Sequence, residues 1–228
     1  MSNLNLASNR HFAALSSWGI SNDIIYQKFL QIVNEFNLKG DLLHFGAGAG
    51  KLTQLIHELG RFGSITSADI MQQPVSLDKS VRWISEDLNN PLNIADETFD
   101  VIVSPEVIEH LENPRAVVRE WLRLLRPGGT LIFSTPNNES WRSLFSLIVQ
   151  GHFVAFVDTC YPAHITPMVR KDIERILNES GFSKPKFVFT DVGGIPKFPT
   201  YKWQSISWGL LKGLRFSDNL IVVCHKNK

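Results

Sequence analysis

Short apolar runs of strand length alternate with amphipathic stretches along this 228-residue chain, and this alternation limits the fold more than any other feature. The predicted strands cover residues 41–46, 63–69, 81–85, 99–104, 130–135, 186–190 and 219–225. Between most of them, apolar residues recur at the spacing of a helix face. Strands that alternate with helices form a mostly parallel sheet with helices on both faces. The sequence therefore predicts an α/β fold with a doubly wound sheet.

The predicted helices begin and end at recognisable signals. They cover residues 22–37, residues 51–59, a stretch from Asn113-Pro114 to the "RPGG" segment, and a stretch from Thr166-Pro167 to Gly181. Asparagine caps a helix and proline fits its first turn, so Asn113 and Pro114 are a strong start signal. Gly181 is a typical helix stop.

Composition and charge exclude several classes of protein. The chain is 43% apolar, and its length suits one domain with a sizeable core. The formal net charge is +1 with no block of like charges, which argues against a nucleic-acid partner. Two distant cysteines, Cys160 and Cys224, do not make a disulfide framework. With no signal peptide or membrane-length apolar run recognised, we expect a cytoplasmic protein.

A glycine-rich loop, "LLHFGAGAGKL" at residues 42–52, follows the first predicted strand. A phosphate-binding P-loop would need a glycine where the chain has Phe45 and a hydroxyl where it has Leu52. A dinucleotide fingerprint would need a glycine where the chain has Lys51. The P-loop is thereby rejected, and dinucleotide binding is weakened but stays open.

A third interpretation is a loop whose glycines, Gly46, Gly48 and Gly50, let the backbone pass close beneath a ligand. A tight turn without a ligand is the alternative. Polar residues also end or follow the next three predicted strands: Asp69, Asp87 and Ser104. Ligands of such sheets bind outside the carboxyl ends of the strands. At these positions one carboxylate can accept hydrogen bonds from ribose hydroxyls and the other from an adenine amine.

Several stretches resemble class I S-adenosylmethionine-dependent methyltransferases. They are "LLHFGAGAGKLTQLI", "SADI", "EDL", "FDVIVSPEVIEHLENPRAVVREWLRLLRPGGTLIFSTPN" and "HITPMVRKDIERILNESGF", between about residues 38 and 182. "SDNLIVVCHK" resembles the family's final antiparallel strand. The block "EVIEHL…RPGG…STPN" is similar to the branch that holds ubiquinone-pathway O-methyltransferases and many small-molecule or glycan methyltransferases.

The resemblance implies a fold and a domain organisation. The sheet would be Rossmann-like, with seven strands in the order 3-2-1-4-5-7-6 and the last strand antiparallel. Residues 1–228 would form a single methyltransferase domain. Within it we expect an N-terminal helical cap at 1–38 and an acceptor-side insert at 137–166.

The resemblance also implies the cofactor, S-adenosylmethionine, which leaves as S-adenosylhomocysteine. Its binding residues would be Gly46, Ala47, Gly48, Gly50, Asp69, Ile70, Asp87, Leu88 and Ser104. Asp69 would bind the ribose and Asp87 the adenine amine, while Ile70 and Leu88 would pack on the adenine faces. Ser104 would line the methionine end. Where the family usually has an acidic residue, this chain has His44, which we interpret as a packed histidine; a role toward the cofactor is the alternative.

The methyl group of a sulfonium is already activated, so the protein must mainly hold acceptor, methyl and sulfur in line. A hydroxyl acceptor also needs a base. In "PEVIEHLENP", Glu106, Glu109 and His110 would share one face of a helix. His164 lies in the segment after the fifth predicted strand, residues 130–135. His110 is the first candidate base and His164 the second, with Glu106 beside them. The alternative is that Glu109 and His110 only fix the loop.

The same four residues resemble the metal site of small-RNA 3′-end 2′-O-methyltransferases. Two carboxylates and two imidazoles could hold Mg²⁺, Mn²⁺ or Zn²⁺. We nevertheless expect no resident metal, and the near-neutral charge argues against an RNA substrate. Two further functions stay open on a sheet of this kind. One is a nicotinamide-dependent dehydrogenase, and the second is a non-catalytic scaffold that binds the cofactor.

Two apolar segments bear on the acceptor and on partners. The insert at 137–166 is rich in aromatic residues and long for a connection, which favours a cover over the acceptor. We expect the acceptor to be a small molecule, a lipid-linked intermediate or a glycan. Residues 201–216 combine tryptophans and leucines with lysines. We interpret them as a helix on the core or at a homodimer contact, with peripheral membrane contact as the alternative.

Overall fold

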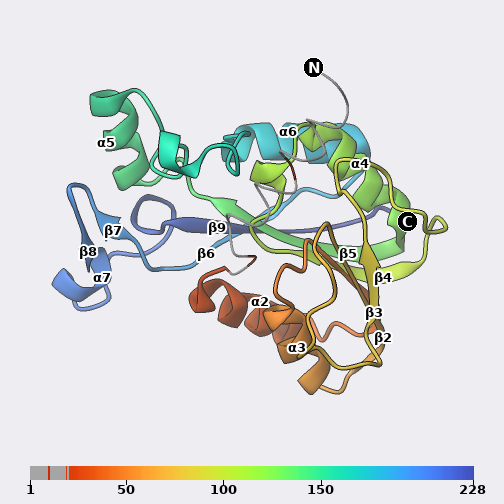
Figure 1. Ribbon diagram of the computed structural model, residues 1–228. Helices are drawn as coiled ribbons and strands as arrows, with labels where there is room; N and C mark the ends of the chain where they lie inside the picture. Colours follow the sequence, from red (N-terminus) through yellow and green to blue (C-terminus); the bar gives the residue numbers. More distant parts are fainter. Residues whose placement is uncertain (1–9, 11–18, 20) are drawn as a thin grey trace.

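The computed structural model describes residues 10, 19 and 21–228. Seven strands form one sheet in the order β3-β2-β1-β4-β5-β9-β6 (Figure 1). They are β1 (Gly40–Phe45), β2 (Phe62–Asp69), β3 (Arg82–Ser85), β4 (Phe99–Ser104), β5 (Leu125–Pro136), β6 (Lys186–Phe189) and β9 (Asn219–His225). The strands from β3 to β5 pair in parallel, and β9 runs antiparallel to β5 and β6. Along the chain, β9 is the seventh strand to join this sheet, so the predicted order 3-2-1-4-5-7-6 is confirmed.

Helices cover both faces of the sheet, as predicted for a doubly wound fold. In Figure 1, α2 (Asp23–Glu35) and α3 (Lys51–Glu58) lie below the sheet, and α4 (Pro114–Leu124) and α6 (Arg170–Ser180) lie above it. The start signal of α4 is confirmed, because the Asn113 side chain accepts a hydrogen bond from the Ala116 amide at 3.1 Å. Most of the predicted cap at 1–38 before α2 lies outside the described residues.

The core divides into two clusters, one on each face of the sheet. Because side chains alternate along a strand, neighbouring leucines of β1 point to opposite faces. Leu43 packs in the cluster that contains Trp121 of α4. Leu42 packs in the cluster that contains Phe29 of α2. The apolar strand residues are therefore covered on both sides, and polar groups that end a strand are left to line its carboxyl end.

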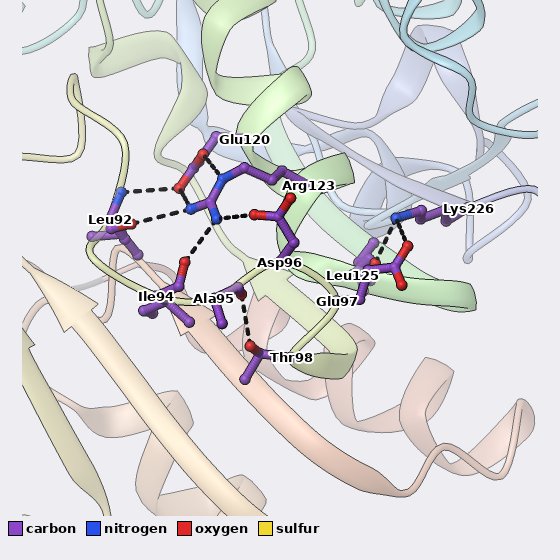
Figure 2. Close-up of polar contacts among 10 residues, drawn as sticks. All are labelled: Leu92, Ile94, Ala95, Asp96, Glu97, Thr98, Glu120, Arg123, Leu125 and Lys226. Atoms are coloured by element: carbon purple, nitrogen blue, oxygen red, sulfur yellow. Dashed lines mark hydrogen bonds and ion pairs between the residues drawn. The ribbon is translucent and has the colours of Figure 1, made fainter.

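A partly buried ion pair holds the loop that leads into β4 (Figure 2). Glu120, with 9% side-chain exposure, accepts hydrogen bonds from the Arg123 guanidinium at 2.7 and 2.8 Å. The same carboxylate accepts from the Leu92 amide at 2.9 Å, and Arg123 donates to the carbonyls of Leu92 and Ile94. One turn of α4 thereby fixes the path of residues 92–96.

Two predicted boundaries are wrong. The helix predicted from Thr166 begins at Arg170 instead, because the amide and hydroxyl of Thr166 donate to the Glu109 and Leu111 carbonyls. The strand predicted at 130–135 begins earlier, at Leu125, which pairs with Phe99 of β4. In both cases, long-range hydrogen bonds override a local signal.

The segment at 201–216 is not one helix. It contains the end of β8 (Phe198–Lys202), the short α7 (Trp203–Ile206) and the 3₁₀ turn η3 (Leu214–Phe216). Gly209 and Gly213 have φ angles of +80° and +79°, which no helix interior allows. β8 pairs with β7 (Gly194–Ile195), and the insert at 137–166 carries α5 (Trp141–Gln150) and η2 (Asp158–Cys160). Within the described residues, every helix is too short or too polar to span a bilayer.

Candidate active site

A cavity of about 870 Å³ opens at the carboxyl ends of the central strands. One half is lined by residues that end or follow β1, β2 and β3, including Gly46, Asp69 and Asp87. The other half is lined by residues after β4 and by the segment that precedes α6, including Glu106 and His164. A volume of this size suits a cofactor together with a small acceptor.

The glycine loop is shaped by close packing as much as by room for a ligand. Gly46 and Gly48 have φ angles of +80° and +52°. A Cβ at Gly46 would collide with the Val107 side chain, and one at Gly48 would collide with the Gly19 carbonyl oxygen. Gly46, Ala47 and Gly48 line the cavity. Gly50 lies outside the cavity lining and is the N-cap residue of α3.

Asp69 ends β2 directly beneath the glycine loop. Its carboxylate accepts hydrogen bonds from the Gly48 amide at 2.7 Å and the Met71 amide at 2.9 Å. Burial raises the pKa of Asp69, although these amide donors oppose the shift. Each carboxylate oxygen keeps a further lone pair, so the side chain can accept hydroxyl donors from the cavity.

Asp87 lines the same half and contacts Arg10. The Arg10 guanidinium donates to one Asp87 oxygen at 2.6 Å and to Glu112 at 2.7 Å, and the Asn89 amide donates to the other Asp87 oxygen at 3.0 Å. Burial acts to raise the pKa of Asp87, but the donors from Asn89 and Arg10 outweigh it and lower that pKa. Sequence patterns gave no signal for Arg10, because its partners lie 77 and 102 residues away.

The remaining predicted cofactor residues divide into two groups. Ile70 and Leu88 both line the cavity, so their apolar side chains are available to a flat ring. Ser104 is fully buried and lies outside the cavity lining. Its hydroxyl has no hydrogen-bond partner among the described residues. The structure thus brings Ile70 and Leu88 to the site and leaves Ser104 beneath it.

His44 lies at the floor of the cavity with 1% exposure. Its Nδ1 shares a hydrogen bond of 2.7 Å with Thr53, which in turn contacts Ser67 at 3.0 Å. Burial lowers the pKa of His44 to about 3, so the ring is neutral at physiological pH. Its Nε2 has no partner within the described part of the chain. The packed interpretation fits this geometry, with Nε2 buried and, within the described residues, unpaired.

Glu106 does not share a helix face with Glu109 and His110. Its φ angle is +53°, and only Ile108–His110 form a short 3₁₀ turn, η1. Its carboxylate accepts hydrogen bonds from Ser134 and Asn219, each at 2.7 Å. Burial raises the pKa of Glu106 to about 7. The backbone reversal therefore turns this carboxyl toward β5 and β9.

Glu109, His110 and His164 form a separate cluster. One ligand atom of each lies within 4.8 Å of the others, and the two histidine rings are 4.7 Å apart. Each ring donates its Nδ1 hydrogen to a carbonyl, His110 to Ala163 at 2.8 Å and His164 to Ala155 at 2.7 Å. Nε2 of each ring is therefore the basic nitrogen. Burial, with the neighbouring His164, lowers the pKa of His110 to about 4.

Glu109 is fully buried in this cluster. Within the described part of the chain, neither carboxylate oxygen has a hydrogen-bond partner. Burial, together with the charge of Glu106, raises the pKa of Glu109 well above its usual value. A carboxyl in such a place is either protonated or neutralised by a cation.

The chain matches the family model described as "Methyltransferase domain" over residues 22–184. The chain belongs to this family. The fold and the family together identify a class I S-adenosylmethionine-dependent methyltransferase domain, so the dehydrogenase interpretation falls away. Among the lining residues that the sequence prediction missed are Arg10, which lies in no motif, and Asn219, whose stretch was predicted only as a strand.

Relatives and solved structures agree with the family. The chain is 32% identical over 174 residues to the ubiquinone biosynthesis O-methyltransferase of Parvibaculum lavamentivorans, covering 71% of this chain and 64% of that protein. It is 27% identical to the mitochondrial enzyme of that name from Candida albicans, covering 78% and 56%. The chain spans about half the length of the curated relatives it matches.

Similarity to solved structures concerns the fold. A methyltransferase of Archaeoglobus fulgidus, named as dependent on S-adenosylmethionine, superposes with a TM-score of 0.64 at 18% identity, covering 95% of this chain and 99% of that one. The N-methyltransferase NodS of Bradyrhizobium japonicum, solved with S-adenosylhomocysteine, gives 0.57 at 18% identity, covering 89% and 86%.

Proposed function

We propose that this protein transfers a methyl group from S-adenosylmethionine to a hydroxyl oxygen of a small-molecule, lipid-linked or glycan acceptor. One observation carries the proposal. A single cavity joins the Gly46–Gly48 loop and Asp69 to Glu106, His110 and His164. The names of the relatives, which are O-methyltransferases, support oxygen as the acceptor atom. Two free thiols, Cys160 and Cys224, support a reducing compartment such as the cytoplasm.

The first half of the cavity fits the cofactor. Asp69 offers carboxylate oxygens to ribose hydroxyls, Ile70 and Leu88 offer apolar contact to adenine, and Gly46 and Gly48 keep side chains out of the floor. S-adenosylmethionine supplies a methyl carbon that its positive sulfur already activates. The protein's task is then to orient the acceptor and to take its proton.

We place the proton acceptor at Glu106 rather than His110. A general base works best when its pKa lies near the working pH. The pKa of Glu106 is about 7 and that of His110 about 4, so His110 holds a proton only weakly at neutral pH. In this proposal the Nε2 of His110 orients the acceptor hydroxyl, and Ser134 and Asn219 hold the Glu106 carboxylate.

Incubation with methyl-labelled S-adenosylmethionine tests the proposal against acceptors that carry phenol, sugar or lipid-linked hydroxyl groups. We expect label on an oxygen of one class and formation of S-adenosylhomocysteine in equal amount. Label found only on nitrogen or carbon would refute oxygen transfer. Cofactor binding without turnover on any acceptor from cell extract would support a non-catalytic scaffold instead.

A second candidate is a metal-assisted form of the same reaction. The donor set of Glu109, His110 and His164 fits a cation, because both Glu109 oxygens lack a partner among the described residues and both histidines present Nε2. Histidines that bind metals commonly donate their other nitrogen to a carbonyl, as these do. One carboxylate and two imidazoles favour Zn²⁺ or Mn²⁺. A bound cation would supply a Lewis acid that acidifies the acceptor hydroxyl.

Chelation separates the two candidates. If the metal-assisted form is right, EDTA abolishes turnover, added Mn²⁺ or Zn²⁺ restores it, and His164→Gln loses the metal in elemental analysis. If it is wrong, the purified protein contains no stoichiometric metal and keeps full activity in EDTA. Lys79→Gln, an exposed change away from the cluster, is the matched control.

A further inference from the structure

Helix α5 buries polar residues and exposes apolar ones. Its buried positions are Ser143 and Ser146. The opposite side carries Trp141, Phe145, Ile148 and Val149, and the Ile148 side chain is 83% exposed. This is the reverse of the pattern of a surface helix, whose apolar stripe faces the core. The helix therefore presents an apolar face that the described part of the chain covers only in part.

The β7-β8 hairpin and the turn after it carry further exposed apolar side chains at the same end of the molecule. Trp208 and Leu210 are 94% and 81% exposed, and Phe198, Tyr201 and Ile206 are also exposed. The hairpin lies against α5, since Nζ of Lys197 lies 5.6 Å from the centroid of the Phe145 ring. The turn η3 also lies against α5, since the Arg215 guanidinium carbon lies 5.3 Å from the centroid of the Trp141 ring. Figure 1 shows α5, β7, β8 and α7 together at one end of the molecule.

We call this surface the apolar wing. It consists of Trp141, Phe145, Ile148, Val149, Phe198, Tyr201, Ile206, Trp208 and Leu210. Monomeric soluble proteins rarely expose a contiguous apolar patch rimmed by polar groups unless a partner covers it.

The charged side chains within residues 192–216 are all basic. Residues 192–216 contain Lys197, Lys202, Lys212 and Arg215 and no aspartate or glutamate. The nearest carboxylates outside this segment are already paired: Glu139 with Arg170, Asp218 with Arg142, and Asp191, which accepts from the Gly213 amide, with Lys28. The wing thus combines tryptophan, tyrosine and aliphatic side chains with a basic rim.

We propose that the apolar wing docks on the interface of a bilayer that contains anionic lipids. Tryptophan and tyrosine prefer the headgroup level of a membrane, and lysines beside them are attracted to an anionic leaflet. A second copy of the chain fits less well. A two-fold contact sets the same patch against itself, so the basic rim of one copy would meet the basic rim of the other.

The wing adjoins the acceptor end of the cavity. The Val154 amide, in the segment before His164, donates to Ser143 of α5 at 3.4 Å. A second cavity of about 220 Å³ reaches from Glu106 and His164 to Ser143. A docked bilayer would therefore lie across α5 from the place where we put the acceptor hydroxyl. This last step rests on the proposed function, whereas the docking itself does not.

Sedimentation with large unilamellar vesicles tests the docking. We expect the full chain to bind vesicles of phosphatidylglycerol and phosphatidylcholine, and to bind pure phosphatidylcholine vesicles at least tenfold more weakly. The double variant Ile148→Ser/Trp208→Ser should lose binding by at least tenfold. Lys197→Gln/Lys212→Gln should lose roughly thirtyfold, and raising the salt to about 0.5 M should weaken the wild type similarly.

The matched control is Val75→Ser/Lys79→Gln, which removes an exposed apolar residue and an exposed lysine outside the wing. It should bind as the wild type does. The proposal is overturned if the wild type does not bind anionic vesicles, or if the wing variants bind unchanged. A dimer in light scattering that Trp208→Ser dissociates would also overturn it. The wing variants should bind S-adenosylhomocysteine as the wild type does. A failure of the membrane-docking proposal can therefore be told apart from a failure of the proposed function.

Discussion

Glu106 and His110 are four positions apart, yet the structure gives them opposite chemical character. A left-handed backbone at Glu106 turns its carboxyl toward Ser134 and Asn219, while His110 faces His164. Spacing alone suggested one helix face, because sequence does not reveal a positive φ at a residue other than glycine. Burial then raises the pKa of the acid and lowers that of the imidazole.

Glu106→Gln should lower turnover by about a hundredfold or more, since it removes the proposed proton acceptor. Binding of S-adenosylhomocysteine should be unchanged. In the wild type the reaction requires the unprotonated Glu106 carboxylate. We therefore expect kcat/KM to increase with pH and to reach half of its maximum near pH 7. A pH profile from 5 to 9 with the identified acceptor measures this. A flat profile, or normal turnover by the variant, would return the role to His110.

The buried His44 should make the free energy of unfolding depend on pH. Its folded pKa of about 3 lies below the unfolded value near 6.5, so the unfolded chain binds the proton first as the pH falls. Between pH 6.5 and pH 4 this should remove about 3 kcal/mol from the free energy of unfolding. His44→Gln lacks the effect, so its stability deficit should shrink by that amount on acidification. Urea unfolding at both pH values checks it; a constant difference would contradict it.

At the scale of elements, local signals succeeded where packing agreed with them. The cap at Asn113 and the stop at Gly181, with φ of +104°, lie where predicted. Local signals gave wrong predictions where contacts with residues distant in the sequence determine the structure. Thr166 bonds to the η1 region instead of starting a helix. The amphipathic pattern at 201–216 does not become a helix, because glycines and the pairing of β8 with β7 interrupt it.

Helix α4 offers a matched pair of arginines. Arg123→Met should lower the free energy of unfolding by about 2–3 kcal/mol, because it leaves the Glu120 carboxylate buried without its partner (Figure 2). Arg115→Met on the same helix removes an exposed pair with Glu179 and should change it by less than about 0.5 kcal/mol. Urea unfolding measures both. Equal effects would show that the Glu120–Arg123 pair is not special.

At the scale of the whole molecule, the architecture of the sheet explains which residues of the site could be predicted from the sequence. The carboxyl ends of β1, β2 and β3 meet at one edge, so residues that end these strands converge there whatever the loops do. Asp69, Asp87 and the glycines were predictable for that reason. Arg10 and Asn219 reach the cavity from distant parts of the chain, and no spacing indicates them. Gly50 and Ser104 belong to the motifs but lie outside the cavity lining.

The central claim is that the strand-end half of the cavity binds the cofactor of a class I methyltransferase, and calorimetric titration with S-adenosylhomocysteine tests it most directly. We predict one site per chain. Asp69→Ala should weaken binding by about a hundredfold, because two charge-assisted hydrogen bonds are lost. Asp172→Ala, an exposed change on α6, should bind as the wild type does. If S-adenosylhomocysteine does not bind, or binds equally well to Asp69→Ala, the claim is wrong.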